Sequence, residues 1–180
     1  LVINDSQGTG VITGKSYVLH SAGGSSITLN AGKIYRASSW AVYTTGVFTV
    51  NGGSVETPDG SAAIRVAGSG SVNLEGGTVT SVQVTSGALN ITDSDATVTN
   101  GVTIEDGAKE VNISSGTIKG EVNVETGAEE KITISGGAFS DDVSDYLDGN
   151  KAVIKNEDGS YEVVAGLIKI ADKYYGTVKD

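Results

Sequence analysis

A short pattern of alternating apolar and polar residues recurs six times along this chain. Each copy reads apolar, polar, apolar, then a polar or glycine turn, then apolar again. The copies begin at Ile27, Phe48, Val72, Leu89, Val111 and Ile132. Their starts lie 21, 24, 17, 22 and 21 residues apart. Self-similarity at a period of roughly 20–50 residues is typical of repeat architectures, so the pattern predicts a solenoid.

Aligning the six copies sorts the residues into columns. Two apolar columns flank a polar one, as expected for a strand with one buried face, and the apolar pairs are Ile27/Leu29, Phe48/Val50, Val72/Leu74, Leu89/Ile91, Val111/Ile113 and Ile132/Ile134. The polar column between them holds Thr28, Thr49, Asn73, Asn90, Asn112 and Thr133. A third apolar column holds Ile34, Val55, Val79, Val98, Ile118 and Phe139.

A second alternating phrase lies between the copies of the first. It begins at Ala41, Ala63, Val82, Val102 and Val122, and each copy leads into a turn that contains glycine. One repeat therefore carries at least two strands and two bends. Such a path closes one coil of a solenoid, and successive coils pair about 4.8 Å apart.

The turn after the first strand has a recurring composition. Glycine occupies one register position in five copies, at Gly32, Gly53, Gly77, Gly116 and Gly137. A bend that needs a positive φ favours glycine there. Asn30 and Asn51 open this turn in two successive copies, which predicts a short asparagine stack.

The repeat stops after Phe139. A helical turn is expected just after Ser140, and Asp158-Gly159 between two alternating segments indicates a β-hairpin. The segment from Ala165 to Asp180 contains more strand-like residues, at Ile168–Ile170 and Tyr174–Tyr175. We interpret residues 1–139 as parallel β-helix repeats, and residues 140–180 as a carboxyl-terminal cap and the start of a linker to a following module.

Composition and charge narrow the class of protein. The 180 residues include 26 Gly, one Pro, no Cys and no Met. Because there is no Cys, no disulfide framework is expected. Because there is no Met, even at the first position, we expect that the chain begins inside a longer precursor. No apolar run is long enough for a membrane span. All of the net charge of −10 lies in residues 91–180, which hold 18 acids and 8 bases. An acidic surface argues against nucleic-acid binding, which requires a basic stripe.

The densest acidic clusters are the candidates for a metal site. They are Asp93 with Asp95, and Asp141 with Asp142. Neither offers the six or more spaced oxygen ligands of a dedicated calcium loop, so we expect no cofactor and at most weak Ca²⁺ binding.

The carboxyl-terminal segment resembles a known family. The phrase ISGGAFSDDVSDYLDGNKAVIKNEDGSYEVV, followed by GLIKIADKYYGTVKD, is similar to a segment of large cell-surface, adhesin-like proteins of Gram-positive gut-type bacteria. The resemblance covers about 45 residues, and the upstream repeats match those proteins only in style. It implies a pectin-lyase-like, right-handed β-helix in an exported, multi-domain protein of the cell surface or wall. It implies no activity.

Catalysis needs convergent ionisable groups, and the sequence offers few. A polysaccharide lyase needs a base, and a hydrolase needs paired carboxylates. The alignment places Arg65 on an outward column with Tyr43, Gln83, Thr103 and Asn123, without an accompanying acidic cluster. His20 is the single histidine. We therefore expect that the chain is not an enzyme.

One cluster suggests binding. Tyr17, Tyr35, Arg36, Trp40 and Tyr43 lie within the first two coils, and aromatic faces can stack on sugar rings. The alternative is that these rings cap or fill the core, since the register that places Val42 inward also places Trp40 inward.

The sequence as a whole favours a structural role. We expect a non-catalytic stalk, spacer or adhesive module whose partners are other modules of the same chain, host or dietary glycans, or a surface protein. A carbohydrate-binding module is the alternative, and a polysaccharide lyase or hydrolase is the third reading.

Overall fold

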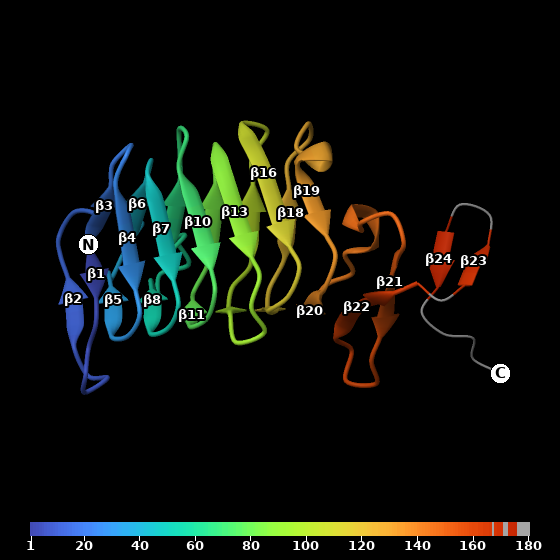
Figure 1. Cartoon of the computed structure of the whole chain (residues 1–180), viewed down its shortest axis with the longest axis horizontal. Helices are drawn as coiled ribbons and strands as arrows, with labels where there is room; N and C mark the ends of the chain where they lie inside the picture. Colours follow the sequence, from blue (N-terminus) through green and yellow to red (C-terminus); the bar gives the residue numbers. More distant parts are fainter. Residues whose placement is uncertain (167, 171–172, 176–180) are drawn as a thin grey trace.

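The computed structural model describes residues 1–166, 168–170 and 173–175, and it shows a stack of β coils with a hairpin at one end (Figure 1). Within this part of the chain, the regular elements are strands apart from two single-turn 3-10 helices, at Glu129–Lys131 and Ser144–Tyr146. The coils pair in parallel throughout. The predicted all-β parallel β-helix is therefore confirmed.

Each complete coil contributes one strand to each of three sheets, here named A, B and C. Sheet A contains β1 (Val2–Ile3), β4 (Ser26–Leu29), β7 (Val47–Val50), β10 (Ser71–Leu74), β13 (Gly87–Ile91), β16 (Ala108–Ile113) and β19 (Ile132–Ile134). Sheet B contains β2 (Val11–Thr13), β5 (Lys33–Tyr35), β8 (Ser54–Glu56), β11 (Thr78–Val79), β14 (Thr97–Val98), β17 (Thr117–Ile118) and β20 (Gly137–Phe139). Sheet C contains β3 (Leu19–Ser21), β6 (Val42–Thr44), β9 (Ile64–Val66), β12 (Val82–Val84), β15 (Val102–Ile104) and β18 (Val122–Val124).

Each complete coil has three strands, whereas the sequence pattern predicts at least two. The sequence pattern places a bend and one further apolar residue after the first strand. In the structure that apolar residue lies in a strand of two or three residues in sheet B. Such a short strand contains one inward position, so a period of two is not visible in it.

The core is the set of aligned columns. Phe48 pairs with Ile27 on one side and Val72 on the other, and Val55 pairs in the same way with Ile34 and Val79. Nearly every residue of the three predicted apolar columns is fully buried, and none is more than 7% exposed. Aliphatic and β-branched side chains suit this stacking because they pack well against identical neighbours on a pleated surface.

The predicted turn features are also present. All five aligned glycines have a positive φ, between 71° at Gly77 and 110° at Gly137. The Asn51 amide donates to the Asn30 side-chain oxygen at 2.9 Å, and Asn30 donates to Asn4 at 2.8 Å. A second ladder runs along the outer face of sheet A, from Asn112 through Asn90 to Asn73.

A hairpin covers part of the last coil. Strand β22 (Tyr161–Ala165) pairs antiparallel with β20 and with β21 (Lys151–Lys155), so it extends sheet B past the final coil (Figure 1). A bridge between Ile134 and Leu147 extends sheet A by one position. Sheet C ends at β18. The predicted hairpin turn has Gly159 at φ 88°.

The remaining elements lie outside the stack of coils. Strands β23 (Ile168–Ile170) and β24 (Lys173–Tyr175) form an antiparallel pair, in the segment where the sequence predicts strand-like residues. The rest of the predicted linker, at residues 167, 171–172 and 176–180, lies outside the described residues. At the other end of the stack, the first coil has exposed apolar side chains, with Leu1 70%, Val2 58% and Val11 55% exposed. In the described part of the chain, none of the helices has the length and apolar character needed to span a membrane.

Candidate functional site

The outer face of sheet C carries a column of unlike side chains. His20 on β3 pairs with Tyr43 on β6, which pairs with Arg65 on β9, and Gln83 on β12 follows. This is the outward column that the sequence alignment assigns to Arg65, extended by His20. Because the column runs along the axis of the stack, neighbouring side chains are about 4.8 Å apart at their backbones.

Aromatic rings gather at the first two coils of this column. Tyr17 stacks on Tyr43 with ring centroids 5.3 Å apart and an angle of 25° between the rings. His20 lies 5.2 Å from Tyr43, and Trp40 lies 6.4 Å from it. Tyr17 is 46% exposed. We call the surface formed by these four rings and Arg65 the sheet C platform.

Trp40 belongs to this platform, and its predicted inward orientation is wrong. Its indole nitrogen donates to Gln83 Oε1 at 3.1 Å, and the Arg65 guanidinium carbon lies 4.3 Å from its ring centroid. The physical reason is a break in alternation before β6. The Ala41 and Val42 amides both donate to the Ala63 carbonyl, so both residues are buried and Trp40 turns outward.

A chain of hydrogen bonds fixes the orientation of the indole. Gln83 accepts from Trp40 and donates through its own amide to Glu105 Oε1 at 2.6 Å. The Arg65 guanidinium stacks on the indole and forms no salt bridge with any residue that the structure describes. Its Nε atom is buried and has no hydrogen-bond partner among the described residues. The platform therefore combines an aromatic ring of fixed orientation with a positive charge that forms no salt bridge among the described residues.

The structure separates the other two predicted binding residues from the platform. Arg36 donates to the Trp40 carbonyl at 2.9 Å and to the Lys15 carbonyl at 3.4 Å, so its guanidinium braces two turns. Tyr35 projects from β5 in sheet B instead. Three of the five predicted residues, Tyr17, Trp40 and Tyr43, thus lie together.

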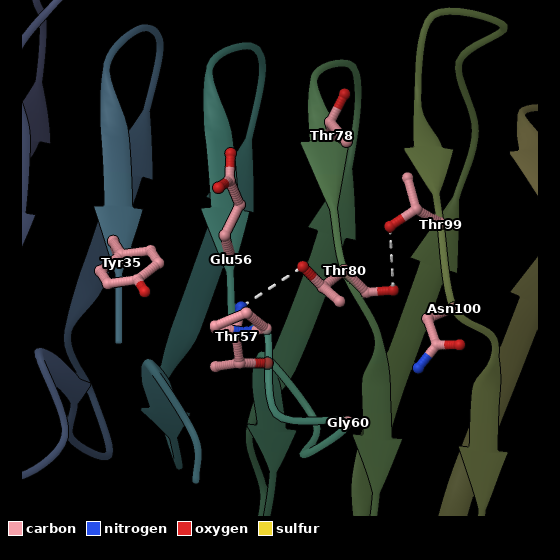
Figure 2. Close-up of a pocket in the computed structure, with 9 residues that line it drawn as sticks. Tyr35, Glu56, Thr57, Gly60, Thr78, Thr80, Thr99 and Asn100 are labelled. Carbon is pink, nitrogen blue, oxygen red and sulfur yellow. Dashed lines mark hydrogen bonds between the residues drawn. The ribbon is translucent and has the colours of Figure 1, made fainter. Parts of the chain in front are cut away.

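Tyr35 lines a groove on the sheet B side of the stack, with a volume of about 560 Å³ (Figure 2). Its main lining side chains come from four successive coils, and they are Tyr35, Glu56, Thr57, Thr80, Thr99 and Asn100. We call this feature the sheet B groove. Pro58 and Gly60 complete one wall, in the turn that follows β8.

The column alignment contains a signal for this groove that our sequence analysis missed. Tyr35, Glu56, Thr80 and Thr99 each follow a residue of the third apolar column. Extending that column by one position would have found them as an outward row. The turn residues Thr57 and Asn100 could not be found in this way, because the length of that turn differs from coil to coil.

Glu56 is the one ionisable carboxylate in the lining of the groove. Its carboxylate accepts from Lys33 Nζ at 2.9 Å and from the Ser54 hydroxyl at 2.8 Å. Burial acts to raise the pKa of Glu56, but these two hydrogen bonds and the Lys33 charge outweigh it, so the pKa lies below its ordinary value. The group is therefore ionised at neutral pH.

The candidate metal ligands do not form a cluster. Asp93 accepts a hydrogen bond from the Asp95 amide at 2.8 Å, and Asp142 accepts one from the Ser144 amide at 3.0 Å, so both carboxylates stabilise turns. Across the described residues, there is no group of three or more His, Cys, Asp or Glu side chains that could hold a metal ion.

Comparisons with known protein families, with curated proteins and with solved structures found no match to this chain. The interpretation of its function therefore depends on the geometry described above.

Proposed function

We propose that this chain is a non-catalytic structural and adhesive module of an exported bacterial surface protein, with a pectin-lyase-like β-helix as its rod. In this role it would hold other modules of the same protein away from the cell and present its outer faces to partners. The resemblance of the segment Ile134–Val164 to such proteins supports the location.

The observation that carries the proposal is the unbroken bonding between coils. From β4 to β19 each strand of sheet A pairs in parallel with the next, and sheets B and C run beside it. Bending such a rod would stretch hydrogen bonds on at least one of three sides. Between β4 and β19 there are five steps of about 4.8 Å, so this part of the rod is about 24 Å long.

Spin labels can test the rigidity of the rod. The chain has no Cys, so a pair such as Thr28→Cys and Thr133→Cys places labels only on the outer face of sheet A. We expect one narrow distance distribution at about 24 Å. The control pair Thr49→Cys and Thr133→Cys spans one step fewer and should give a distance shorter by about 4.8 Å. A broad distribution for both pairs would contradict a stiff spacer.

The shortage of paired carboxyl groups in the sheet B groove supports the proposal that the chain is not catalytic. Hydrolases of polysaccharides use two carboxyl groups about 5–10 Å apart, and the sheet B groove has one, which is ionised. Incubation with pectin, polygalacturonate and alginate, with and without calcium, should give no unsaturated products and no new reducing ends. Turnover that disappears in Arg65→Ala would overturn this part of the proposal.

A second candidate function is carbohydrate binding by the sheet C platform. The favouring observation is that one platform holds the exposed Tyr17 ring, which stacks on Tyr43, and the Arg65 guanidinium, which lies over Trp40, a combination that suits an acidic sugar. A glycan array compared between the wild type, Tyr17→Ala and Trp40→Ala tests it. Binding of acidic glycans that both substitutions abolish would support this function, and binding that neither affects would exclude the platform.

A further inference from the structure

We propose that the sheet B groove is a separate binding site for a neutral oligosaccharide. The groove is distinct from the sheet C platform because its lining side chains project from sheet B and from the turns that follow it (Figure 2). This inference goes beyond the rod proposal, which does not require any ligand.

The groove offers the two kinds of contact that a sugar ring uses. The Tyr35 ring gives an aromatic face at one end, against which the C–H side of a pyranose can pack. Thr80 and Thr99 on the next coils give hydroxyl groups, and Asn100 gives an amide group from the turn that follows Thr99 (Figure 2). Pockets of about 300–1,000 Å³ hold small ligands, and this groove has a volume of about 560 Å³.

Several of these polar groups are available to a ligand. Among the described residues, the Tyr35 hydroxyl, the Thr78 hydroxyl and the Asn100 side-chain amide make no hydrogen bond to another protein group. Thr57 differs, because the residue is 1% exposed and its hydroxyl donates to the Ser61 carbonyl at 2.7 Å. Thr57 therefore shapes the wall, and the exposed polar groups would exchange water for sugar hydroxyls.

The electrostatics of the groove favour a neutral ligand over an acidic one. None of its lining residues is basic, and the positive charge of Lys33 is already paired with Glu56 at 2.9 Å. A uronic acid would thus meet an ionised carboxylate and no unpaired cation. A neutral sugar can instead donate a hydroxyl to Glu56, which is a charge-assisted hydrogen bond.

The groove spans the coils from Tyr35 to Asn100, which is three steps of about 4.8 Å, or about 14 Å. That length exceeds a single pyranose ring, so the site should prefer an oligosaccharide to a monosaccharide. Thr80 and Thr99 lie on successive coils and would offer their side chains to successive sugar units.

Titration calorimetry on the whole chain tests the proposal, with cellohexaose, mannohexaose and maltohexaose as neutral probes and hexagalacturonate as the acidic probe. At least one neutral hexasaccharide should bind more tightly than hexagalacturonate and more tightly than its own monosaccharide. Tyr35→Ala should weaken this binding about tenfold, the factor expected for loss of one aromatic contact, whereas Tyr35→Phe keeps the ring, loses only the hydroxyl and should weaken it less. Asn100→Ala, at an exposed position, gives a second variant that leaves the core intact.

Glu56→Gln supplies the sharpest control, because it releases Lys33 from its ion pair and should increase binding of hexagalacturonate. Thr133→Ala, at an exposed position on the outer face of sheet A, should leave the neutral affinity unchanged. The proposal is overturned if no neutral hexasaccharide binds, or if Tyr35→Ala and Asn100→Ala both bind as the wild type does. Neither result would alter the label distances that test the rod.

Discussion

The inside and the outside of the coils follow different rules. Inside, every coil repeats nearly the same aliphatic residues, so Val50, Leu74 and Ile91 occupy equivalent buried positions in successive coils. Outside, equivalent positions on sheet C hold His20, Tyr43, Arg65, Gln83 and Thr103 in turn. The buried positions thus repeat from coil to coil, whereas the outer face of sheet C carries a different residue in each coil.

This difference separates the requirements of shape from those of binding. A buried column stacks well when neighbours are alike, because each side chain fits between two of its own kind. A recognition surface needs unlike groups at fixed spacing, and the ladder supplies the spacing without restricting the outward residue. Both candidate binding surfaces therefore combine residues from several coils.

The largest expected effect comes from exposing the interior at the end of the rod. A chain that ends at Ser140 loses β22, which pairs with β20, and leaves the edge of sheet B open. We expect self-association in light scattering and a lower melting temperature, since an unpaired strand edge is a template for pairing. A shortened chain that stays monomeric and melts with the full-length chain would show that residues 141–180 are not a cap.

A pair of neighbouring substitutions compares the two faces of one strand. Ile113 is 1% exposed, between Ile91 and Ile134, whereas Asn112 is on the outer face. Ile113→Ala should lower the free energy of unfolding by about 2–5 kcal/mol, from lost apolar burial and a cavity. Asn112→Ala should cost about 0.5–1.5 kcal/mol, for one hydrogen bond in the asparagine ladder. Equal effects in denaturant titrations would contradict the assignment of faces.

Two glycines sharpen the comparison at the turns. Gly53 and Gly60 both have a positive φ, of 72° and 82°. A Cβ at Gly53 would overlap the Gly32 carbonyl oxygen of the preceding coil, whereas one at Gly60 would meet no described atom within 4 Å. Gly60→Ala should therefore cost only the backbone strain, about 1–2 kcal/mol, and Gly53→Ala distinctly more. Thermal denaturation of the two variants measures the difference, and similar melting temperatures would mean that the coils separate easily at this turn.

The smallest effect concerns the outer ion pair of Lys33 and Glu56. Because the pKa of Glu56 is lowered in the folded chain, its stabilisation is complete above the ordinary value of 4.5 and is lost as the pH falls through the lowered pKa. Glu56→Gln should thus reduce stability at neutral pH, and less so in acid. Because the side chains of Lys33 and Glu56 are 41% and 34% exposed, water screens the ion pair. Its loss should therefore lower the free energy of unfolding by no more than about 1 kcal/mol.

Denaturant titrations of the wild type and Glu56→Gln between neutral and acidic pH check this last expectation. Glu75→Gln is the matched control, because Glu75 is an exposed carboxylate without a salt bridge to any described residue. An identical pH dependence for Glu56→Gln and the wild type would mean that the ion pair contributes nothing measurable.

The sequence predicts the interior well because the same buried pattern repeats in each coil. Ile27, Phe48 and Val72, for example, occupy one column, so the assignment of each is supported by the other two. The sequence also predicts the outward column through Arg65, because the buried residues on either side of that column repeat from coil to coil. It fails at Trp40, where two amides share one carbonyl and the alternation breaks. It also fails for the sheet B groove, since Thr57 and Asn100 come from turns whose lengths vary and whose path depends on tertiary contacts.

The way in which coils bond only to their neighbours has a consequence for how the molecule comes apart. Within the described residues, the first coil pairs with one neighbouring coil, while the last coil of sheet B pairs with β22 as well. In a one-dimensional array, stability passes along the chain one interface at a time. Opening should start at the first coil and travel towards the hairpin, so amide exchange would slow progressively from Ile3 to the middle of the stack. The molecule would then behave as a zipper that is fastened at one end.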